Sequence, residues 1–131
     1  MKNSKKNHEA HILITVRLKS KRLKRKALLK LGNLKLVQHQ IKRLKKNFPS
    51  KNIIIITSKK KEDLILKKIA MKEKIQFYQG QSNDVLKRMF GAATKFNLTN
   101  FINCTGDNPF VDPFYAKKIY EYHMKKNFDF T

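Results

Sequence analysis

The sequence of 131 residues is poor in cysteine, proline, glycine and acidic residues, and each shortage excludes a class of protein. A single cysteine excludes an internal disulfide framework and is typical of a reducing compartment, so we expect a cytoplasmic protein. No apolar run approaches the ~20 residues of a membrane-spanning helix, so we expect no membrane association. With three prolines and four glycines, the chain shows no linker, which indicates one domain.

The shortage of acidic residues leaves a net charge of +22, from nine Asp and Glu against 31 Lys and Arg. Clustered cations bind nucleic acids by releasing counterions, so a basic nucleic-acid-binding module is one hypothesis. The lysines are spread through nearly every polar segment, however, which favours a solvated face over an ordinary fold. Only residues 17–26 are dense in cations, and this stretch has no aromatic residue on which bases would stack. Nucleic acid is therefore an unlikely partner.

Short apolar runs alternate with segments of helical period along the chain. The apolar runs predict strands at 12–16, 52–57, 75–78 and 100–104, with a fifth beginning at 128–130. The periodic segments predict helices at 36–46, 62–71, 84–96 and 113–124, the last with Asp112 as its N-cap. Such alternation predicts an α/β fold, with a parallel sheet covered by helices on both faces.

The two ends of the chain differ in character from the rest. We expect residues 1–10 to form a basic, disordered tail and residues 11–131 to form the folded, nucleotide-binding part. The chain stops inside the apolar run 128–130, from which we expect it to be the front part of a longer unit.

Polar or glycine-bearing residues follow each predicted strand. Arg17 opens the basic stretch after the first strand, and Thr57 ends the second. Gly80 follows the third strand, and Gly106 with Asp107 follows the fourth. Because ligands bind at the carboxyl ends of the strands in an open parallel sheet, we expect these residues to converge on one edge.

Cations and a carboxylate at that edge are suited to binding a polyphosphate with its metal ion. Fixed Arg and Lys side chains attract phosphate groups, and Arg17, Arg22 and Lys26 are the candidates. Proteins hold Mg²⁺ through one or two carboxylates together with substrate phosphates, a role that suits Asp107. The four histidines have no metal-ligand spacing, and Cys104 lies inside a predicted strand as a core residue.

Three blocks of the sequence match motifs of one known family in order and in spacing. The first block matches at Arg17, Ser20, Arg22, Leu23 and Lys26. The second matches at Gly80, Asp84, Val85, Leu86 and Arg88, and the third at Thr105, Gly106, Asp107, Pro109, Asp112 and Pro113. The blocks resemble the acylneuraminate and 3-deoxy-manno-octulosonate cytidylyltransferases, and especially the spore-coat polysaccharide biosynthesis protein F group.

The resemblance implies a Rossmann-like, three-layer α/β/α nucleotidyltransferase fold that binds CTP and Mg²⁺. It also implies that the hydroxyl of an acidic or amino sugar attacks the α-phosphate with loss of pyrophosphate. The implied nucleotide-binding residues are Arg17, Ser20, Arg22, Lys26, Thr57, Ser58, Asp84 and Arg88, of which Arg17 and Lys26 are also catalytic. Asp107 is the implied metal ligand.

The sequence departs from the family pattern in two residues and in length. Lys24 stands where the family has a proline that fixes φ, and Lys19 stands where a glycine is common. The family domain is nearly twice as long, and its second half supplies the sugar pocket, another metal carboxylate and most of the homodimer contact. A non-catalytic remnant therefore stays an alternative to the enzyme. A glycosyltransferase of similar fold is disfavoured, because Asp107 is not part of an Asp-x-Asp motif.

Overall fold

The computed structural model describes residues 9–19 and 22–131, and a parallel sheet of four strands forms their centre. The strands are β1 (Ile12–Thr15), β4 (Ile53–Ser58), β5 (Gln76–Gly80) and β6 (Ile102–Thr105). Their order across the sheet is β5-β4-β1-β6, and each neighbouring pair is parallel. The first four predicted strands are therefore confirmed, with small shifts at their ends.

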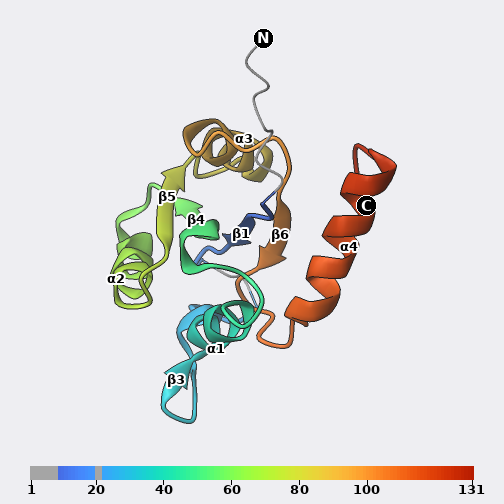
Figure 1. Cartoon of the computed structure of the whole chain (residues 1–131). Coiled ribbons are helices and arrows are strands. Elements are labelled where there is room, and N and C mark those ends of the chain that lie inside the picture. Colours follow the sequence, from blue (N-terminus) through green and yellow to red (C-terminus); the bar gives the residue numbers. More distant parts are fainter. Residues whose placement is uncertain (1–8, 20–21) are drawn as a thin grey trace.

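Helices connect these strands and cover the sheet (Figure 1). The α-helices of the described residues are α1 (Leu36–Leu44), α2 (Ile65–Lys72), α3 (Val85–Lys95) and α4 (Pro113–Lys126). Short 3₁₀ turns are η1 (Lys26–Leu28), η2 (Ser50–Asn52) and η3 (Lys61–Leu64). Asp112 is the N-cap that the sequence predicts, because its side chain accepts hydrogen bonds from the amides of Phe114 and Tyr115 at 2.9 and 3.3 Å.

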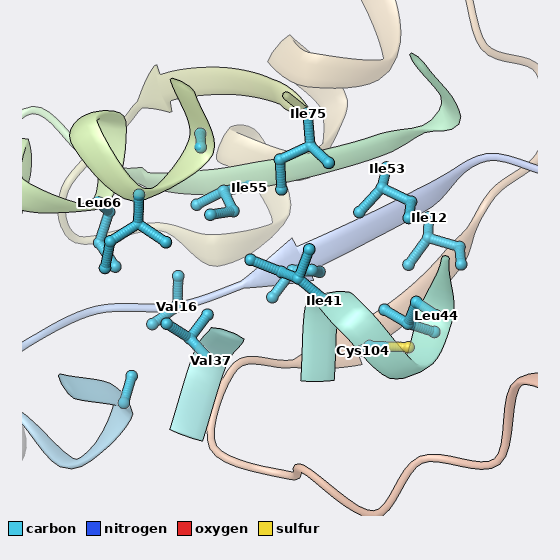
Figure 2. Close-up of a cluster of buried hydrophobic side chains, with 14 of the residues drawn as sticks. Ile12, Val16, Val37, Ile41, Leu44, Ile53, Ile55, Leu66, Ile75 and Cys104 are labelled. Atoms are coloured by element: carbon cyan, nitrogen blue, oxygen red, sulfur yellow. The ribbon is translucent and has the colours of Figure 1, made fainter. Parts of the chain in front are cut away.

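Different helices cover the two faces of the sheet. Successive side chains of a strand point to opposite faces, and the four isoleucines of β4 alternate in this way. Ile53 and Ile55 pack with α1 and α2 in the larger core cluster (Figure 2). Ile54 and Ile56 pack on the other face against Ala92 of α3. The predicted α/β/α layers are thus present, and the unbroken isoleucine run reflects burial on both faces.

The side of the sheet formed by β6 carries α4, the last helix. Ala116 of α4 packs against the larger core cluster, which also contains Cys104 of β6 (Figure 2). Cys104 is buried, as predicted, and burial raises the pKa of its thiol to about 11. Its thiol is therefore almost fully protonated at neutral pH and a poor nucleophile.

A small hairpin between β1 and α1 was not predicted. It pairs β2 (Lys30–Leu31) with β3 (Leu34–Lys35) in antiparallel fashion, and Figure 1 shows it projecting below α1. Gly32 opens the two-residue turn with φ of 65°, a conformation that glycine adopts without steric cost. The Gly-Asn pair at residues 32–33, between short apolar stretches, is the sequence signal of this hairpin.

The predicted strand at 128–130 is wrong. Helix α4 continues to Lys126, past the predicted end at residue 124, and no strand follows it in the described part of the chain. Asn127 then takes the left-handed conformation that commonly terminates helices. The chain turns back, so the Phe128 ring lies 6.0 Å from the Tyr122 ring, while Phe130 is exposed.

The predicted tail at residues 1–10 falls mostly outside the description, because residues 1–8 are not among the described residues. Ala10, at the end of that range, packs against the larger core cluster, and its carbonyl oxygen accepts a hydrogen bond from Asn52 at 3.3 Å. Within the described residues, none of the helices has the length and apolar character needed to cross a bilayer.

Candidate functional site

The carboxyl ends of the four strands lie side by side at one edge of the sheet. Thr15, the last residue of β1, is in register with Ile56 of β4 and Thr105 of β6. Ser58 at the end of β4 is in register with Gly80 at the end of β5. Loops that are far apart in the sequence therefore meet at this edge, where open parallel sheets bind ligands.

The loops after β1 and β5 contact each other through Arg17. This residue is exposed, and its Nη1 donates a hydrogen bond to the carbonyl oxygen of Ser82 at 3.3 Å. The guanidinium group therefore lies over the turn that follows β5, with further donors left for an anion. The expected convergence of Arg17 with the turn after Gly80 is confirmed.

The basic stretch also contacts the turn after β6. The Lys26 Nζ lies 3.4 Å from the Asp107 Oδ2, although residues 26 and 107 are far apart in the sequence. Their side chains are 45% and 51% exposed. An ion pair with this exposure contributes about 0–1 kcal/mol to stability, so a phosphate or a metal ion can replace either partner at small cost.

The turn that carries Asp107 is held from two sides. The Gly106 amide donates to the Thr15 carbonyl oxygen at 2.9 Å, and Gln40 of α1 donates its Nε2 to the Thr105 carbonyl oxygen at 2.9 Å. A Cβ atom on residue 106 would lie 2.5 Å from the Cβ of Val16, a distance that requires glycine. The turn is therefore fixed against β1 and α1, with the Asp107 carboxylate directed to the surface.

Arg88 of α3 lies beneath the same edge and is fully buried. Its Nη1 donates to the carbonyl oxygens of Gln81 and Ser82 at 2.7 and 3.5 Å, whereas Nε and Nη2 have no partner within the described structure. Burial, followed by repulsion from Arg17, lowers the pKa of Arg88, and the carboxylates of Asp63 and Asp84 act in the opposite direction. Arg88 thus supports the turn after β5 from inside.

Asp84 caps the amino end of α3, close to the turn after β5. Its side chain accepts a hydrogen bond from the Lys87 amide at 3.0 Å, which makes it the N-cap of α3. It thereby fixes the first turn of the helix that also carries Arg88. Its role in binding a nucleotide stays a prediction.

Thr57 and Ser58 occupy an interior position at this edge. Both residues are fully buried. The Ser58 hydroxyl donates to the Asp63 carboxylate, and the Thr57 Oγ1 is buried with no hydrogen-bond partner among the described residues. Neither side chain is open to a ligand in this conformation, so their place beside a nucleoside stays a prediction.

The remaining predicted residues belong to the basic stretch. Arg22 is exposed, and Ser20 lies outside the described residues. Among the residues described, no three His, Cys, Asp or Glu side chains gather into a metal-binding group. Of the two carboxylates among the predicted residues, that of Asp84 caps α3 and that of Asp107 is half exposed, so substrate phosphates and water would have to supply the other ligands of a metal at Asp107.

Two residues of the site were missed by sequence reasoning, namely Asp63 and Gln40. Asp63 is one of only nine acidic residues, and it follows a buried strand. Gln40 is a polar residue on the face of α1 that also carries Val37 and Ile41 of the core, and it is fully buried. A scarce acid beside a strand end and a polar residue on an apolar helix face were the available signals.

Comparison with known proteins adds to this geometry. The sequence model of the cytidylyltransferase family matches residues 11–131, nearly the whole chain. The chain belongs to this family. An uncharacterized protein of Methanocaldococcus jannaschii is 36% identical over 91% of this chain and 49% of its own length. The spore coat polysaccharide biosynthesis protein SpsF of Bacillus subtilis is 32% identical over 91% of this chain and 51% of its own.

Solved structures agree with the family assignment. A cytidylyltransferase from Leptospira borgpetersenii superimposes with a TM-score of 0.84 at 26% identity, over 89% of this chain and 49% of that one. The synthetase of CMP-2-keto-3-deoxy-manno-octonic acid, solved with CTP, shares the fold with a TM-score of 0.75 at 18% identity, over 91% and 48%. The Rossmann-like nucleotidyltransferase fold is therefore confirmed, and the chain spans about half the length of these relatives.

Proposed function

We propose that this cytidylyltransferase-family chain binds CTP with Mg²⁺ and acts in transfer of CMP to a sugar hydroxyl, with release of pyrophosphate. The observation that carries the proposal is the meeting of Lys26 with Asp107 at the carboxyl edge of the sheet, beside Arg17. Cations and an exposed carboxylate are thereby gathered where this fold binds ligands. The family membership of the chain and the CTP bound by a protein of the same fold support the choice of nucleotide.

The residues of the edge would neutralise and orient the triphosphate. Arg17 offers the planar donors of its guanidinium group, and Lys26 offers an ammonium group on a flexible side chain. In the transfer, the sugar hydroxyl loses its proton to water and its oxygen bonds to the α-phosphorus, while the bond to the oxygen bridging the α- and β-phosphates breaks. The leaving pyrophosphate gains negative charge as that bond breaks, and Arg17 and Lys26 would stabilise this charge.

Asp107 would hold the metal ion. Its carboxylate is half exposed, lies on a fixed turn and has an easily replaced partner in Lys26. One such carboxylate fits Mg²⁺, which keeps several waters and binds substrate phosphates. When bound, Mg²⁺ would offset the negative charge that develops on the leaving pyrophosphate.

The acceptor we propose is an acidic or amino sugar for surface polysaccharide, with a cytoplasmic homodimer as the working form. The name of the Bacillus subtilis relative supports the polysaccharide role. The residues that would bind a sugar are not among those identified at the edge, and the relatives are about twice as long. A non-catalytic member of the family is therefore the alternative for this chain.

Binding of single-stranded nucleic acid is a second candidate, favoured by exposed aromatic rings on α4. Lys118 lies 4.7 Å from the centre of the Phe114 ring, and Lys126 lies 5.9 Å from that of Tyr122. Bases stack on such rings beside cations. These rings belong to α4, whereas the dense basic stretch follows β1, so this candidate needs a second, separate surface.

Calorimetric titration with CTP, ATP, GTP and UTP, each with Mg²⁺, tests the proposal. We expect CTP to bind at least about tenfold more tightly than ATP, a difference of ~1.4 kcal/mol. Equal affinity for all four nucleotides would contradict it and indicate non-specific binding by a cationic surface. Pyrophosphate release with CTP and a panel of acidic sugars then separates an active enzyme from a non-catalytic family member.

A further inference from the structure

Asp63 is a buried carboxylate that the proposed chemistry does not use. It lies in η3, directly after β4, and is 1% exposed. Its Oδ1 accepts a hydrogen bond from the Leu18 amide at 3.0 Å, and its Oδ2 accepts one from the Ser58 hydroxyl. One carboxylate therefore joins the end of β4 to the first residues after β1.

Leu18 is the residue through which the basic stretch is anchored. Its side chain is 2% exposed within the larger core cluster, and its carbonyl oxygen accepts a hydrogen bond from the Arg25 amide at 2.9 Å. Arg25, with φ of 55°, reverses the chain so that Lys26 begins η1. Leu18 is thus held by hydrogen bonds at its amide and its carbonyl oxygen and by the packing of its side chain in the core.

The two cations proposed to bind phosphate are the chain neighbours of Leu18 and Arg25. Arg17 precedes Leu18, and Lys26 follows Arg25, so the position of both depends on where Leu18 is held. The polar contact that holds the Leu18 amide is Asp63. A shift of the Leu18 amide away from Asp63 would carry Arg17 off Ser82 and Lys26 off Asp107.

We propose that Asp63 is a positioning residue, which fixes the segment carrying Arg17 and Lys26 at the site without touching the ligand. The proposal deepens the proposed function and rests on it for the identity of the ligand. A carboxylate suits this task, because both of its oxygens accept hydrogen bonds and a charge-assisted bond is stronger than a neutral one. A buried carboxylate needs such partners, and Asp63 has them in the Leu18 amide and the Ser58 hydroxyl.

Glu73 provides a matched control. It is also a buried carboxylate, 5% exposed, and it accepts a hydrogen bond from Gln38 at 3.1 Å. Asp63 precedes helix α2 (Ile65–Lys72) and Glu73 is the C-cap of that helix, so the two carboxylates lie at opposite ends of it. Loss of Glu73 should lower stability without moving Leu18.

The test compares Asp63→Ala, Asp63→Asn and Glu73→Ala in the full chain. Amide hydrogen exchange of Leu18 and Arg25, followed by NMR, reports the anchoring without any ligand. Titration with Mg²⁺ and CTP reports its consequence. We expect Asp63→Ala to speed exchange of Leu18 and to weaken CTP binding at least about tenfold, because a hydrogen bond to a charged group is lost.

Asp63→Asn keeps the size of the side chain and one hydrogen-bond acceptor, so it provides a second test if Asp63→Ala does not fold. In Asp63→Asn we expect Leu18 to stay protected and CTP binding to weaken less than in Asp63→Ala. Glu73→Ala should lower the melting temperature while leaving Leu18 exchange and the CTP Kd within about twofold, a difference of ~0.4 kcal/mol.

Two results would overturn the proposal. The first is Leu18 exchange in Asp63→Ala no faster than in Glu73→Ala at matched stability, which would show that Asp63 does not anchor the segment. The second is an unchanged CTP Kd in Asp63→Ala despite faster exchange. If the unchanged protein binds no triphosphate, the proposed function fails, and the exchange data alone then decide whether Asp63 anchors Leu18.

Discussion

Two groups of lysine and carboxylate side chains occupy very different environments in this protein. Glu73 is 6% exposed in its side chain and lies 3.5 Å from Lys45 and 3.9 Å from Lys42, between α1 and α2. Asp107 is 51% exposed and lies 3.4 Å from Lys26 at the carboxyl edge of the sheet. The distances are similar, so exposure and surroundings distinguish the two groups.

Burial makes the Glu73 group a structural contact. Its carboxylate also accepts from Gln38, and the Lys45 ammonium bonds to its backbone carbonyl oxygen, so its hydrogen-bonding capacity is largely used inside the protein. Asp107, by contrast, is half exposed to solvent, and Lys26 is its ion-pair partner among the residues that the structure describes. A carboxylate that exchanges its partner easily is suited to a ligand, and one that cannot is suited to holding helices together.

The largest effect on stability is expected for Glu73→Ala. Removing a buried acceptor of charged hydrogen bonds should lower the free energy of unfolding by about 2–3 kcal/mol. Urea unfolding measures this loss, and the affinity for CTP measured on the same variant should stay as in the unchanged protein. A loss of affinity in a variant that is still folded would mean that the two groups are not separate.

Gly106→Ala is expected to damage the site through packing. The added methyl group would meet the Val16 side chain at 2.5 Å, and such overpacking costs about 1–3 kcal/mol. Because the turn carries Asp107, the affinity for CTP with Mg²⁺ should fall as well, which titration measures. Gly32→Ala is the control, since its φ of 65° also strains an alanine but the hairpin is outside the site. Equal affinities in both variants would speak against a role for the Gly106 turn.

Lys26→Met should have the smallest effect on stability, about 0–1 kcal/mol, because its ion pair with Asp107 is half exposed. Its affinity for CTP should nonetheless fall several-fold at 0.15 M salt. Lys42→Met is a matched control, with the same change of charge at a lysine of 54% exposure beside Glu73. A similar fall in CTP affinity in both variants would show that total charge, rather than the site, attracts the nucleotide.

Much of the fold was predictable because its signals are local. Apolar periodicity located four strands and four helices, and Asp112 with Pro113 marked the start of α4. The strand predicted at 128–130 is absent because an apolar run forms a strand only beside a neighbouring strand. Asn127 instead turns the chain back after α4. Local patterns therefore give elements reliably only where a partner element exists to pair or pack with them.

The site was predictable to the extent that strand ends and motif residues coincide. Arg17, Lys26 and Asp107 follow strands in the sequence and meet in the structure. Asp63 and Gln40 could not be assigned, because their partners Leu18 and Thr105 lie 45 and 65 residues away. Contacts of that separation depend on the assembled sheet and leave no periodic pattern.

The central claim is that the basic stretch and the Asp107 turn form one metal-dependent nucleotide site. The most direct measurement is the CTP Kd with and without Mg²⁺, in the unchanged protein and in Asp107→Asn. We predict that Mg²⁺ tightens binding at least about tenfold, ~1.4 kcal/mol, in the unchanged protein and leaves the Asp107→Asn Kd nearly constant. The same gain from Mg²⁺ in both proteins would contradict the claim and place the metal elsewhere.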